Sequence, residues 1–300
     1  MSVTTPQLKA DDLTVDPTTA NRRGLRKGLY VIPSAFTAAN IGMGFYAVMA
    51  ALRGFQFVGL GSTSDFERAA VHFDNAAHAI GWAFLFDALD GRIARMTKTT
   101  TELGVQLDSL ADVLTFGIAP AVLAYAWGYG SALKDGSNAH KLGWFLSFMY
   151  LICGAFRLAR FNVQATRPRV LAEGTPKLDK KSFVGLPIPA AALLIAAIVH
   201  FAPLPLIAYE SRYAEMYSSL LMALAGCLGA LMVSNLRYTS FKSIGTGKRG
   251  TPMIILLVAS IGMLIWLFSR HVLLSLAIIY VLHGLLSRFA SLFRRRPPTD

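Results

Sequence analysis

Long apolar runs dominate this chain and restrict it to folds in which helices cross a lipid bilayer. The 300-residue sequence is 54% hydrophobic and 15% charged, whereas soluble domains carry about 25% charged residues. A hydrocarbon layer about 30 Å thick requires about 20 apolar residues per helix, and eight stretches approach this length. We therefore predict an all-α integral membrane protein with about eight transmembrane helices, at residues 29–51, 75–95, 107–127, 142–163, 184–201, 216–236, 253–268 and 272–289.

The basic residues are distributed unevenly between the two sides of this predicted arrangement. The net charge is +12, and all but six of the 29 Lys and Arg lie on one side if the N-terminus is cytoplasmic. The exceptions are Arg53, Arg68, Lys134, Lys141, Arg212 and Arg270. The positive-inside bias then predicts cytoplasmic N- and C-termini in a multi-pass protein of a bacterial-type cytoplasmic (inner) membrane. Basic side chains so placed face anionic lipid headgroups, so nucleic acid is not an expected partner.

The two ends of the chain differ from its apolar middle. Residues 1–28 are polar, so we predict that they form a disordered cytoplasmic tail. Residues 29–289 are predicted to form a transmembrane domain, and residues 290–300 a basic cytoplasmic tail. A cleaved signal peptide is not expected, because the apolar run after Lys27 is too long and polar residues precede it. Cys153 and Cys227 lie in separate apolar spans, and we expect both to be small core residues.

Four aspartates interrupt the predicted membrane helices. Asp87 and Asp90 share one face of a helix, Asp108 and Asp112 share a face of the next, and Asp74 lies at a helix edge. Residues three or four apart on a helix have Cβ atoms about 5–6 Å from each other. A carboxylate within a bilayer helix is costly unless a cation compensates it, so such groups are candidates for a functional site.

Cations from outside the protein are needed to balance these carboxylates. Arg92 and Arg95 supply at most two positive charges, and ligand sets made only of oxygen favour Mg²⁺, Mn²⁺ or Ca²⁺. Two such ions about 4 Å apart can clamp the attacking and leaving oxygens of a phosphoryl displacement. The small residues Gly91, Ala94 and Gly104 let a ligand approach closely. Alternatives are a structural Asp–Arg network, helix caps, or a cation-transport site, although transport sites tend to lie at the bilayer midplane.

The spacing of these residues resembles a known family. The pattern D-x-x-D-G-x-x-A-R, eight residues, then G-x-x-x-D-x-x-x-D is complete between residues 87 and 112. It resembles the signature of the CDP-alcohol phosphatidyltransferases. The blocks D-S-L-A-D-V-L-T-F-G-I-A-P (108–120), R-L-A-R-F-N (157–162), G-L-P-I-P (185–189) and V-S-N-L-R-Y-T-S-F-K (233–242) are similar to the CDP-diacylglycerol–serine O-phosphatidyltransferase branch. The resemblance covers residues 29–282.

This resemblance implies a role for each motif residue. It implies that Asp87, Asp90 and Asp108 hold two divalent cations, Mg²⁺ or Mn²⁺. Asp112 helps to hold metal and acts as the general base on the incoming hydroxyl. The CDP moiety is expected to contact Gly91, Ala94, Arg95 and Gly104.

The resemblance also implies substrates and an assembly state. The expected partners are CDP-diacylglycerol, L-serine and membrane lipids, in a homodimer. Arg157 and Arg160, one helical turn apart, are candidates to hold the lipid phosphate or the serine carboxylate, or else they are snorkelling anchors. Inositol phosphate, glycerol phosphate and choline remain alternative acceptors, and an inactive scaffold is a further alternative. The histidines are expected in interfacial or core positions, because no pair has zinc spacing alongside a Glu.

Overall fold

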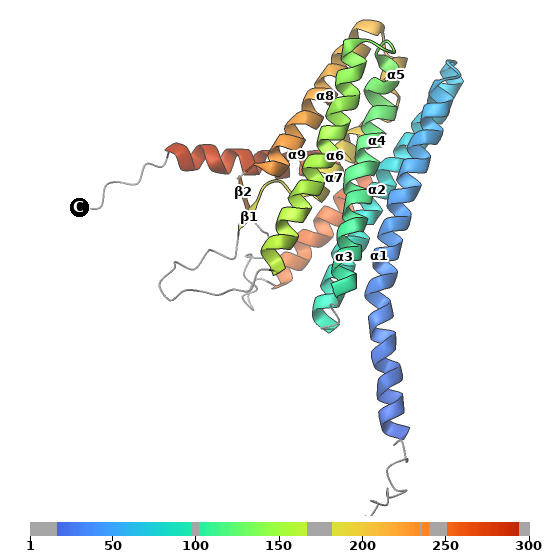
Figure 1. The fold of residues 1–300 in the computed structure, drawn as a ribbon. Helices are drawn as coiled ribbons and strands as arrows, with labels where there is room; N and C mark the ends of the chain where they lie inside the picture. The colour runs from blue at the N-terminus through green and yellow to red at the C-terminus, as the bar shows by residue number, and fades with distance from the viewer. Residues whose placement is uncertain (1–16, 98–101, 167–181, 235, 240–250, 294–300) are drawn as a thin grey trace, which may run out of the picture.

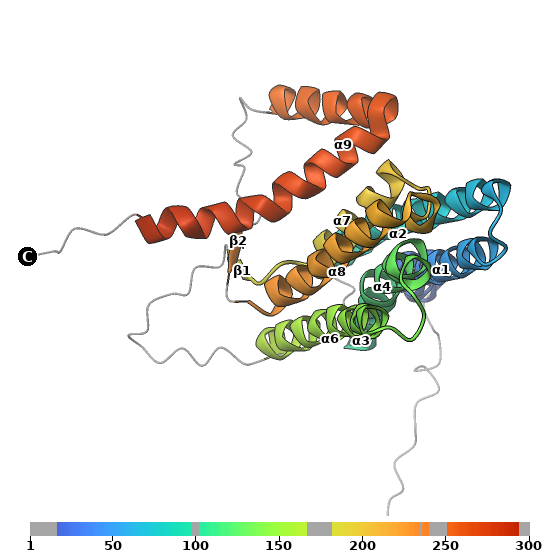
Figure 2. The same ribbon diagram turned by 90° about the horizontal axis from the view of Figure 1, so that it is seen from above.

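The computed structural model describes residues 17–97, 102–166, 182–234, 236–239 and 251–293. Its elements are α1 (Pro17–Val58), α2 (Thr63–Thr97), α3 (Glu102–Asp112), η2 (Val113–Ile118), α4 (Ala119–Ala124), η3 (Tyr125–Tyr129), α5 (Gly130–Ala132), α6 (Asn138–Thr166), β1 (Ser182–Val184), α7 (Ile188–Phe201), η4 (Leu206–Ala208), α8 (Ser211–Val233), β2 (Arg237–Thr239) and α9 (Thr251–Phe293). The helices α1 to α8 run roughly side by side as a bundle, whereas the C-terminal part of α9 extends away from it (Figures 1 and 2). The predicted helical architecture is thus confirmed.

Six helical stretches among the described residues are long and apolar enough to cross a membrane, which identifies an integral, multi-pass membrane protein. They are Ala35–Val58, Leu103–Ala132, Asn138–Val163, Ile188–Ala208, Ser211–Val233 and Ala259–Gly284. The predicted number was eight. One difference lies in α2, which is rich in acidic residues and histidines and is not among the six stretches. The other lies in α9, where one stretch takes the place of two predicted spans.

Helix α9 has a kink at Phe268, whose backbone angles, φ −136° and ψ 45°, are not helical. Figure 2 shows its two halves as separate rods that meet at a sharp turn. These halves correspond to the predicted spans 253–268 and 272–289. Eight crossings therefore stay a prediction, in which α2 and both halves of α9 each cross the membrane.

The first two helices pack closely because small residues line their contact. Both helices carry buried alanines, which are Ala47, Ala50 and Ala51 on α1, and Ala69, Ala76, Ala79 and Ala83 on α2. Gly54 lies against the ring of Phe73, where a Cβ atom would come within 2.7 Å of the ring. Small residues of this kind let membrane helices approach closely. The resulting hairpin holds α2 firmly along its length.

The helix that follows the acidic motif is interrupted by two π-helical segments, η2 and η3. The first begins directly after Asp112 and buries Thr115, Phe116 and Gly117. The Thr115 hydroxyl donates to the Asn40 carbonyl on α1 at 3.3 Å, and the Tyr150 hydroxyl on α6 donates to the Phe116 carbonyl at 3.1 Å. A π-helical turn widens the helix and is frequent at functional sites. Here it is tied to both neighbouring helices.

Two predicted helix ends are wrong because of a short antiparallel ladder. Val184 pairs with Arg237, so α7 begins at Ile188 and not at 184, and α8 ends at Val233 and not at 236. Gly185 adopts φ +83°, which L side chains rarely take, and Pro187 precedes the first helical turn. Helix therefore cannot extend back to residue 184.

The ends of the chain differ in part from the prediction. Helix α1 begins at Pro17, a residue that suits the first helical position. Residues 17–28, predicted to be disordered, are therefore helical, whereas residues 1–16 lie outside the described part. At the other end α9 extends to Phe293, and residues 294–300 of the predicted basic tail are likewise outside it.

Candidate functional site: an acidic cluster at the ends of α2 and α3

Three carboxylates from two helices converge on one point. Asp87 and Asp90 lie near the end of α2, and Asp108 lies on α3. One oxygen from each of the three lies within 4.8 Å of the others. Such spacing allows one metal ion to contact all three, because bonds from a hard divalent cation to oxygen are about 2.0–2.6 Å long. Residues separated by up to 21 positions in the sequence thus form one group.

Asp90 is the most deeply buried member of this group, with 4% of its surface exposed. The Thr37 hydroxyl on α1 donates a hydrogen bond of 2.9 Å to Asp90 Oδ2. Thr37 is also buried. The bond fixes one of the two Asp90 carboxylate oxygens. Thr37 therefore orients Asp90 from the neighbouring helix.

Asp112 lies one helical turn beyond Asp108 and completes the acidic cluster. It is within electrostatic range of Asp87, Asp90 and Asp108, and of the Arg157 guanidinium on α6. Its Oδ1 atom is buried and accepts no hydrogen bond from the described residues. A buried carboxylate oxygen without a donor is costly unless a cation or a proton satisfies it. This observation fits a bound cation.

Arg157 is the basic residue that faces this cluster from α6. Its side chain is half-buried, its Nε atom is buried without a hydrogen bond among the described residues, and it interacts with Asp112 and with Tyr280 on α9. The Asn162 amide donates to Ser109 Oγ at 2.7 Å and so ties this end of α6 to α3. Three helices, α3, α6 and α9, therefore meet around Arg157.

The composition of the cluster fits a hard divalent cation. All four acidic residues offer oxygen ligands, and the described part of the cluster contains no sulfur or imidazole donor. Among the described side chains, Arg157 is the cation that acts on Asp112. Mg²⁺ and Mn²⁺ prefer oxygen ligands, so this donor set suits either ion.

Comparison with known proteins identifies the chain at the level of a family. Residues 30–230 match the CDP-alcohol phosphatidyltransferases. This chain belongs to the CDP-alcohol phosphatidyltransferase family. The matched part includes all four acidic residues together with Arg157 and Arg160, and it ends before α9. The family is metal-dependent, in agreement with the oxygen-rich cluster.

Several relatives in this family carry the same name, CDP-diacylglycerol–serine O-phosphatidyltransferase. The protein from Helicobacter pylori (strain ATCC 700392 / 26695) is 34% identical over 222 residues, 72% of this chain and 75% of the relative. That from Methanocaldococcus jannaschii is 28% identical over 215 residues, 71% of this chain and 83% of the relative. That from Saccharomyces cerevisiae is 35% identical over 157 residues, 52% of this chain and 49% of the relative. Family membership favours a phosphatidyltransferase over a cation transporter.

The remaining residues of the family motif lie near the acidic cluster in the chain, and their roles stay predictions. Gly91 is half-buried on α2, and Gly104 is exposed on α3. Ala94 and Arg95 lie on α2, but their side chains are outside the described part. Arg160 is half-buried on α6, one turn after Arg157.

Sequence reasoning missed two residues that contact this site of the phosphatidyltransferase. Thr37 is a polar residue in an apolar helix, and together with Asn40 one turn later it forms a buried polar pair that could have signalled a contact. Tyr280 lies in the last helix, outside the family match. Nothing in its sequence context distinguishes it from an interfacial tyrosine.

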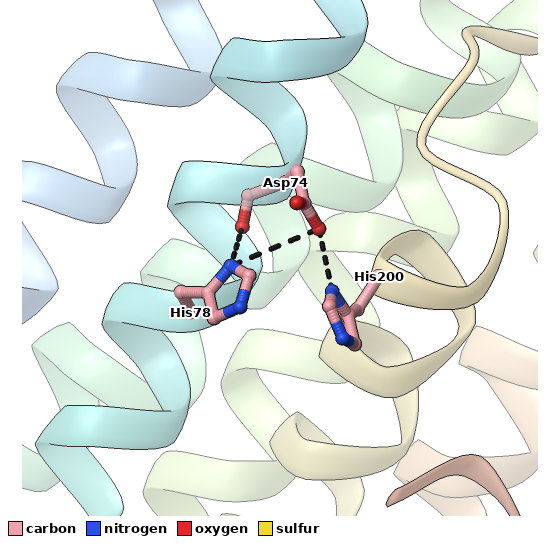
Figure 3. Close-up of side chains that lie close together, drawn as sticks. All are labelled: Asp74, His78 and His200. Atoms are coloured by element: carbon pink, nitrogen blue, oxygen red, sulfur yellow. Dashed lines mark hydrogen bonds and ion pairs between the residues drawn. The ribbon is translucent and has the colours of Figure 1, made fainter. Parts of the chain in front are cut away.

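A second cluster, unrelated to the family motif, also escaped the sequence analysis. Asp74 and His78 on α2 meet His200 near the end of α7 (Figure 3). His200 is 126 residues from Asp74, so no local pattern links them. Asp74 and His78 alone form a D-x-x-x-H pattern on one helix face, and that spacing was the available signal.

Proposed function

We propose that this phosphatidyltransferase transfers the phosphatidyl group of CDP-diacylglycerol to the hydroxyl of L-serine and releases phosphatidylserine and CMP. The observation that carries the proposal is the convergence of Asp87, Asp90 and Asp108, with Asp112 and Arg157 beside them. Serine is supported as the acceptor by the names of the relatives and by the similarity of residues 108–120, 157–162, 185–189 and 233–242 to the serine branch. Inositol phosphate, glycerol phosphate and choline are the competing acceptors.

The four acidic residues are proposed to hold two divalent cations, Mg²⁺ or Mn²⁺. When bound, these ions neutralise the diphosphate of CDP-diacylglycerol and the charge that develops on the departing CMP. Asp90 is presented to them by the hydrogen bond from Thr37. Carboxylates held on two helices that both pack against α1 need little reorganisation when the substrate binds, which favours the transition state.

Asp112 is proposed to be the general base. In the transfer, the serine oxygen forms a bond to the phosphorus of the phosphatidyl group as the bond from phosphorus to the CMP oxygen breaks. The hydroxyl proton passes to Asp112, which must lie about 2.6–3.2 Å from that oxygen. The Oδ1 atom of Asp112 has no hydrogen bond from the described residues and is available for this role.

Arg157 is proposed to hold the serine carboxylate. The phosphates are matched by the metal ions, whereas the serine carboxylate enters a site with four acidic residues and needs a cation of its own. Arg157 interacts with Asp112, the proposed base, so a serine bound there has its hydroxyl near the base. A guanidinium can also bind a carboxylate through two parallel hydrogen bonds. Arg160, one turn further, stays a candidate for either the lipid phosphate or the serine carboxylate.

The cytidine nucleotide is proposed to lie against Gly91, Ala94, Arg95 and Gly104. The absence of a side chain at Gly91 and Gly104 lets the nucleotide approach the backbone. The proposed location is a bacterial-type cytoplasmic membrane, with the site open to the cytoplasm where both serine and CMP are soluble. A homodimer is proposed from the family resemblance alone.

Release of CMP tests both the reaction and the acceptor. Purified protein in detergent micelles is incubated with CDP-diacylglycerol and, in separate reactions, with labelled serine, inositol phosphate, glycerol phosphate or choline. We expect CMP and labelled phosphatidylserine only with serine, and no product after EDTA until Mg²⁺ or Mn²⁺ is restored. Product with another acceptor would replace serine in the proposal. Transfer that persists in EDTA would contradict the metal site.

A further inference from the structure

We propose that Asp74, His78 and His200 form a zinc site, separate from the acidic cluster. The three residues each offer one ligand atom, and these atoms all lie within 4.8 Å of one another. Asp74 is 13 residues before Asp87 on the same helix, which is about 20 Å along the axis at 1.5 Å per residue. The site therefore lies near the opposite end of α2, and it does not depend on the function proposed above.

The donor types favour Zn²⁺ over the ions expected at the acidic cluster. Two imidazoles and one carboxylate are typical of a zinc site in which a fourth position stays open. Mg²⁺ and Ca²⁺ prefer ligand sets made of oxygen. One helix, α2, therefore carries an oxygen-only set at one end and a mixed nitrogen and oxygen set at the other.

Both histidines lie against the Asp74 carboxylate. Asp74 Oδ1 lies 2.6 Å from His200 Nδ1 and 3.7 Å from His78 Nδ1 (Figure 3). Ligand atoms on a tetrahedral zinc ion are about 3.3 Å apart when the bonds are about 2.0–2.1 Å long. The Asp74–His200 contact is a hydrogen bond that a bound ion would open to about this separation. The two imidazole rings meet edge to face with centroids 4.5 Å apart.

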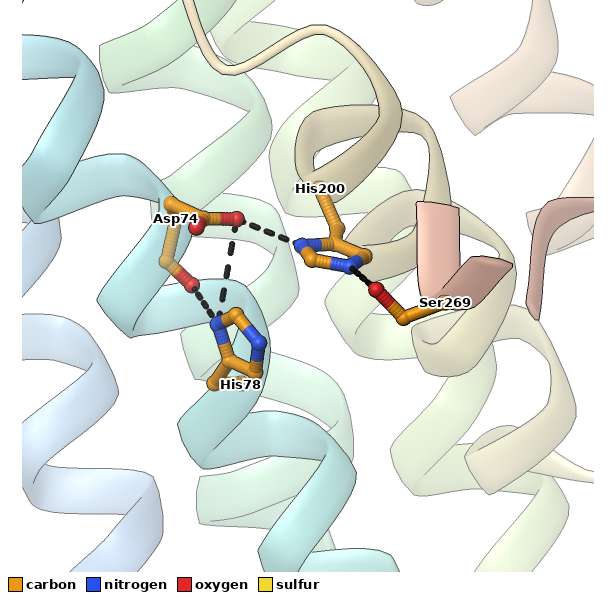
Figure 4. A network of polar contacts seen from close by, with 4 residues as sticks. All are labelled: Asp74, His78, His200 and Ser269. Carbon is orange, nitrogen blue, oxygen red and sulfur yellow. Dashed lines mark hydrogen bonds and ion pairs between the residues drawn. The ribbon is translucent and has the colours of Figure 1, made fainter. Parts of the chain in front are cut away.

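Each imidazole is also held through a nitrogen contact of its own. His200 Nε2 lies 3.0 Å from Ser269 Oγ on α9, and His78 Nδ1 lies 2.9 Å from the Asp74 carbonyl oxygen (Figure 4). Histidines that bind metals usually use one ring nitrogen for the ion and the other for a hydrogen bond that fixes the ring. These contacts leave Nδ1 of His200 and Nε2 of His78 for the ion. Ser269 follows the kink at Phe268, so the turn of α9 brings its hydroxyl to His200.

A hydrogen-bonded relay from Asp74 through His200 to Ser269 is the alternative that needs no ion. That relay uses both nitrogens of His200 but does not include His78, whose Nδ1 atom is bonded to the Asp74 backbone. His78 is directed at the same carboxylate oxygen and has 49% of its side chain exposed, whereas the His200 side chain is 9% exposed. A buried ligand, a partly buried carboxylate and a half-exposed third ligand leave one side of the site open for an ion to enter.

One nearby cation acts against metal binding and has to be considered. Arg270 is within electrostatic range of Asp74, but its side chain is exposed. Interactions of exposed charges are screened by solvent and contribute little. Arg270 therefore weakens the site without removing it.

The test is metal binding by the full-length protein in detergent micelles. Co²⁺ is titrated in as a spectroscopic probe, because nitrogen ligands in a tetrahedral site give visible d–d absorption, and bound Zn²⁺ is measured by mass spectrometry after dialysis. We expect one equivalent of Zn²⁺ that displaces the Co²⁺ absorption. His78→Ala, at a half-exposed position, is expected to lower Zn²⁺ affinity by about 100-fold or more, since even the loss of a residue that only supports a ligand costs about 10–100-fold.

Two matched variants make the result specific. His72→Ala removes a histidine from the same helix that stacks on Phe57 and is not part of the cluster, and it is expected to leave Zn²⁺ binding unchanged. Asp87→Asn alters the acidic cluster and is expected to retain the Co²⁺ absorption. Wild-type protein without Co²⁺ absorption, or absorption that persists in His78→Ala, would overturn the zinc site. The first outcome would favour the Asp74–His200–Ser269 relay.

Discussion

The hydrogen bond from Thr37 to Asp90 offers a direct test of how the acidic cluster is positioned. Thr37→Val replaces the hydroxyl with a methyl group of similar shape at a position with 7% of its surface exposed. The change removes the 2.9 Å bond to Asp90 Oδ2 without altering any proposed ligand. The Asp90 carboxylate then loses the contact that positions it from α1.

The expected magnitude follows from the charge and burial of this bond. A hydrogen bond to a charged group contributes about 1.5–3 kcal/mol, and about 1.4 kcal/mol corresponds to a tenfold change in an equilibrium constant. Loss of a residue that supports a metal ligand lowers metal affinity or activity by about 10–100-fold. We expect Thr37→Val to weaken Mg²⁺ or Mn²⁺ binding by about 10–100-fold, with turnover largely recovered at saturating metal.

The assay is a titration of CMP release against metal concentration at fixed CDP-diacylglycerol and serine. Thr37→Ser is the matched control, because it keeps the hydroxyl and is expected to behave within a few-fold of wild type. An unchanged metal dependence in Thr37→Val would refute the idea that this bond presents Asp90 to a metal. Equal loss in the Val and Ser variants would indicate a packing role for the threonine methyl group.

Three further variants address the base, the serine contact and the helix packing. Asp112→Asn is expected to abolish CMP release while Mg²⁺-dependent nucleotide binding, measured by calorimetry, survives; Asp108→Asn is expected to lose both, and equal nucleotide loss in the two would contradict the separate roles. Arg157→Ala is expected to raise the KM for serine more than tenfold while the KM for CDP-diacylglycerol stays unchanged, and the reverse pattern would assign Arg157 to the lipid phosphate. Gly44→Ala would place a Cβ atom 3.0 Å from the Thr115 backbone and is expected to destabilise the protein by about 1–3 kcal/mol. Thermal unfolding measures this against Gly42→Ala, where nothing lies within 4 Å.

The approach of the aspartates to one another could be predicted because each pair is a local feature. Asp87 and Asp90 share a helix face through their spacing alone, as do Asp108 and Asp112. The short sequence between the two pairs keeps them near each other. The oxygen-only donor set could be inferred in the same way. The roles of these residues in catalysis remain predictions that the variants above test.

Contacts between distant segments could not be predicted from the same evidence. Thr37 and Asp90 are 53 residues apart in the sequence. The apolar periodicity of a helix does not predict which distant side chain a threonine hydroxyl will contact. The π-helical segment after Asp112 depends on how the helix packs between α1 and α6, which no local propensity encodes. The predicted helix ends at 184 and 236 were wrong for the same reason. The β-ladder at these positions pairs two segments that are distant in the sequence, so neither segment predicts it alone.

Helix α2 accounts for one of the two differences between the six apolar stretches of the structure and the eight membrane spans predicted from the sequence. It is 35 residues long, yet it is not among the stretches apolar enough to be recognised as a membrane span. The polar residues that exclude it are Asp74 and His78 toward one end and Asp87 and Asp90 toward the other. Intramembrane ionisable groups persist only where partners or ligands offset their cost. This predicted span is therefore the helix that contributes to both clusters, and the polar residues of the clusters lower its hydropathy.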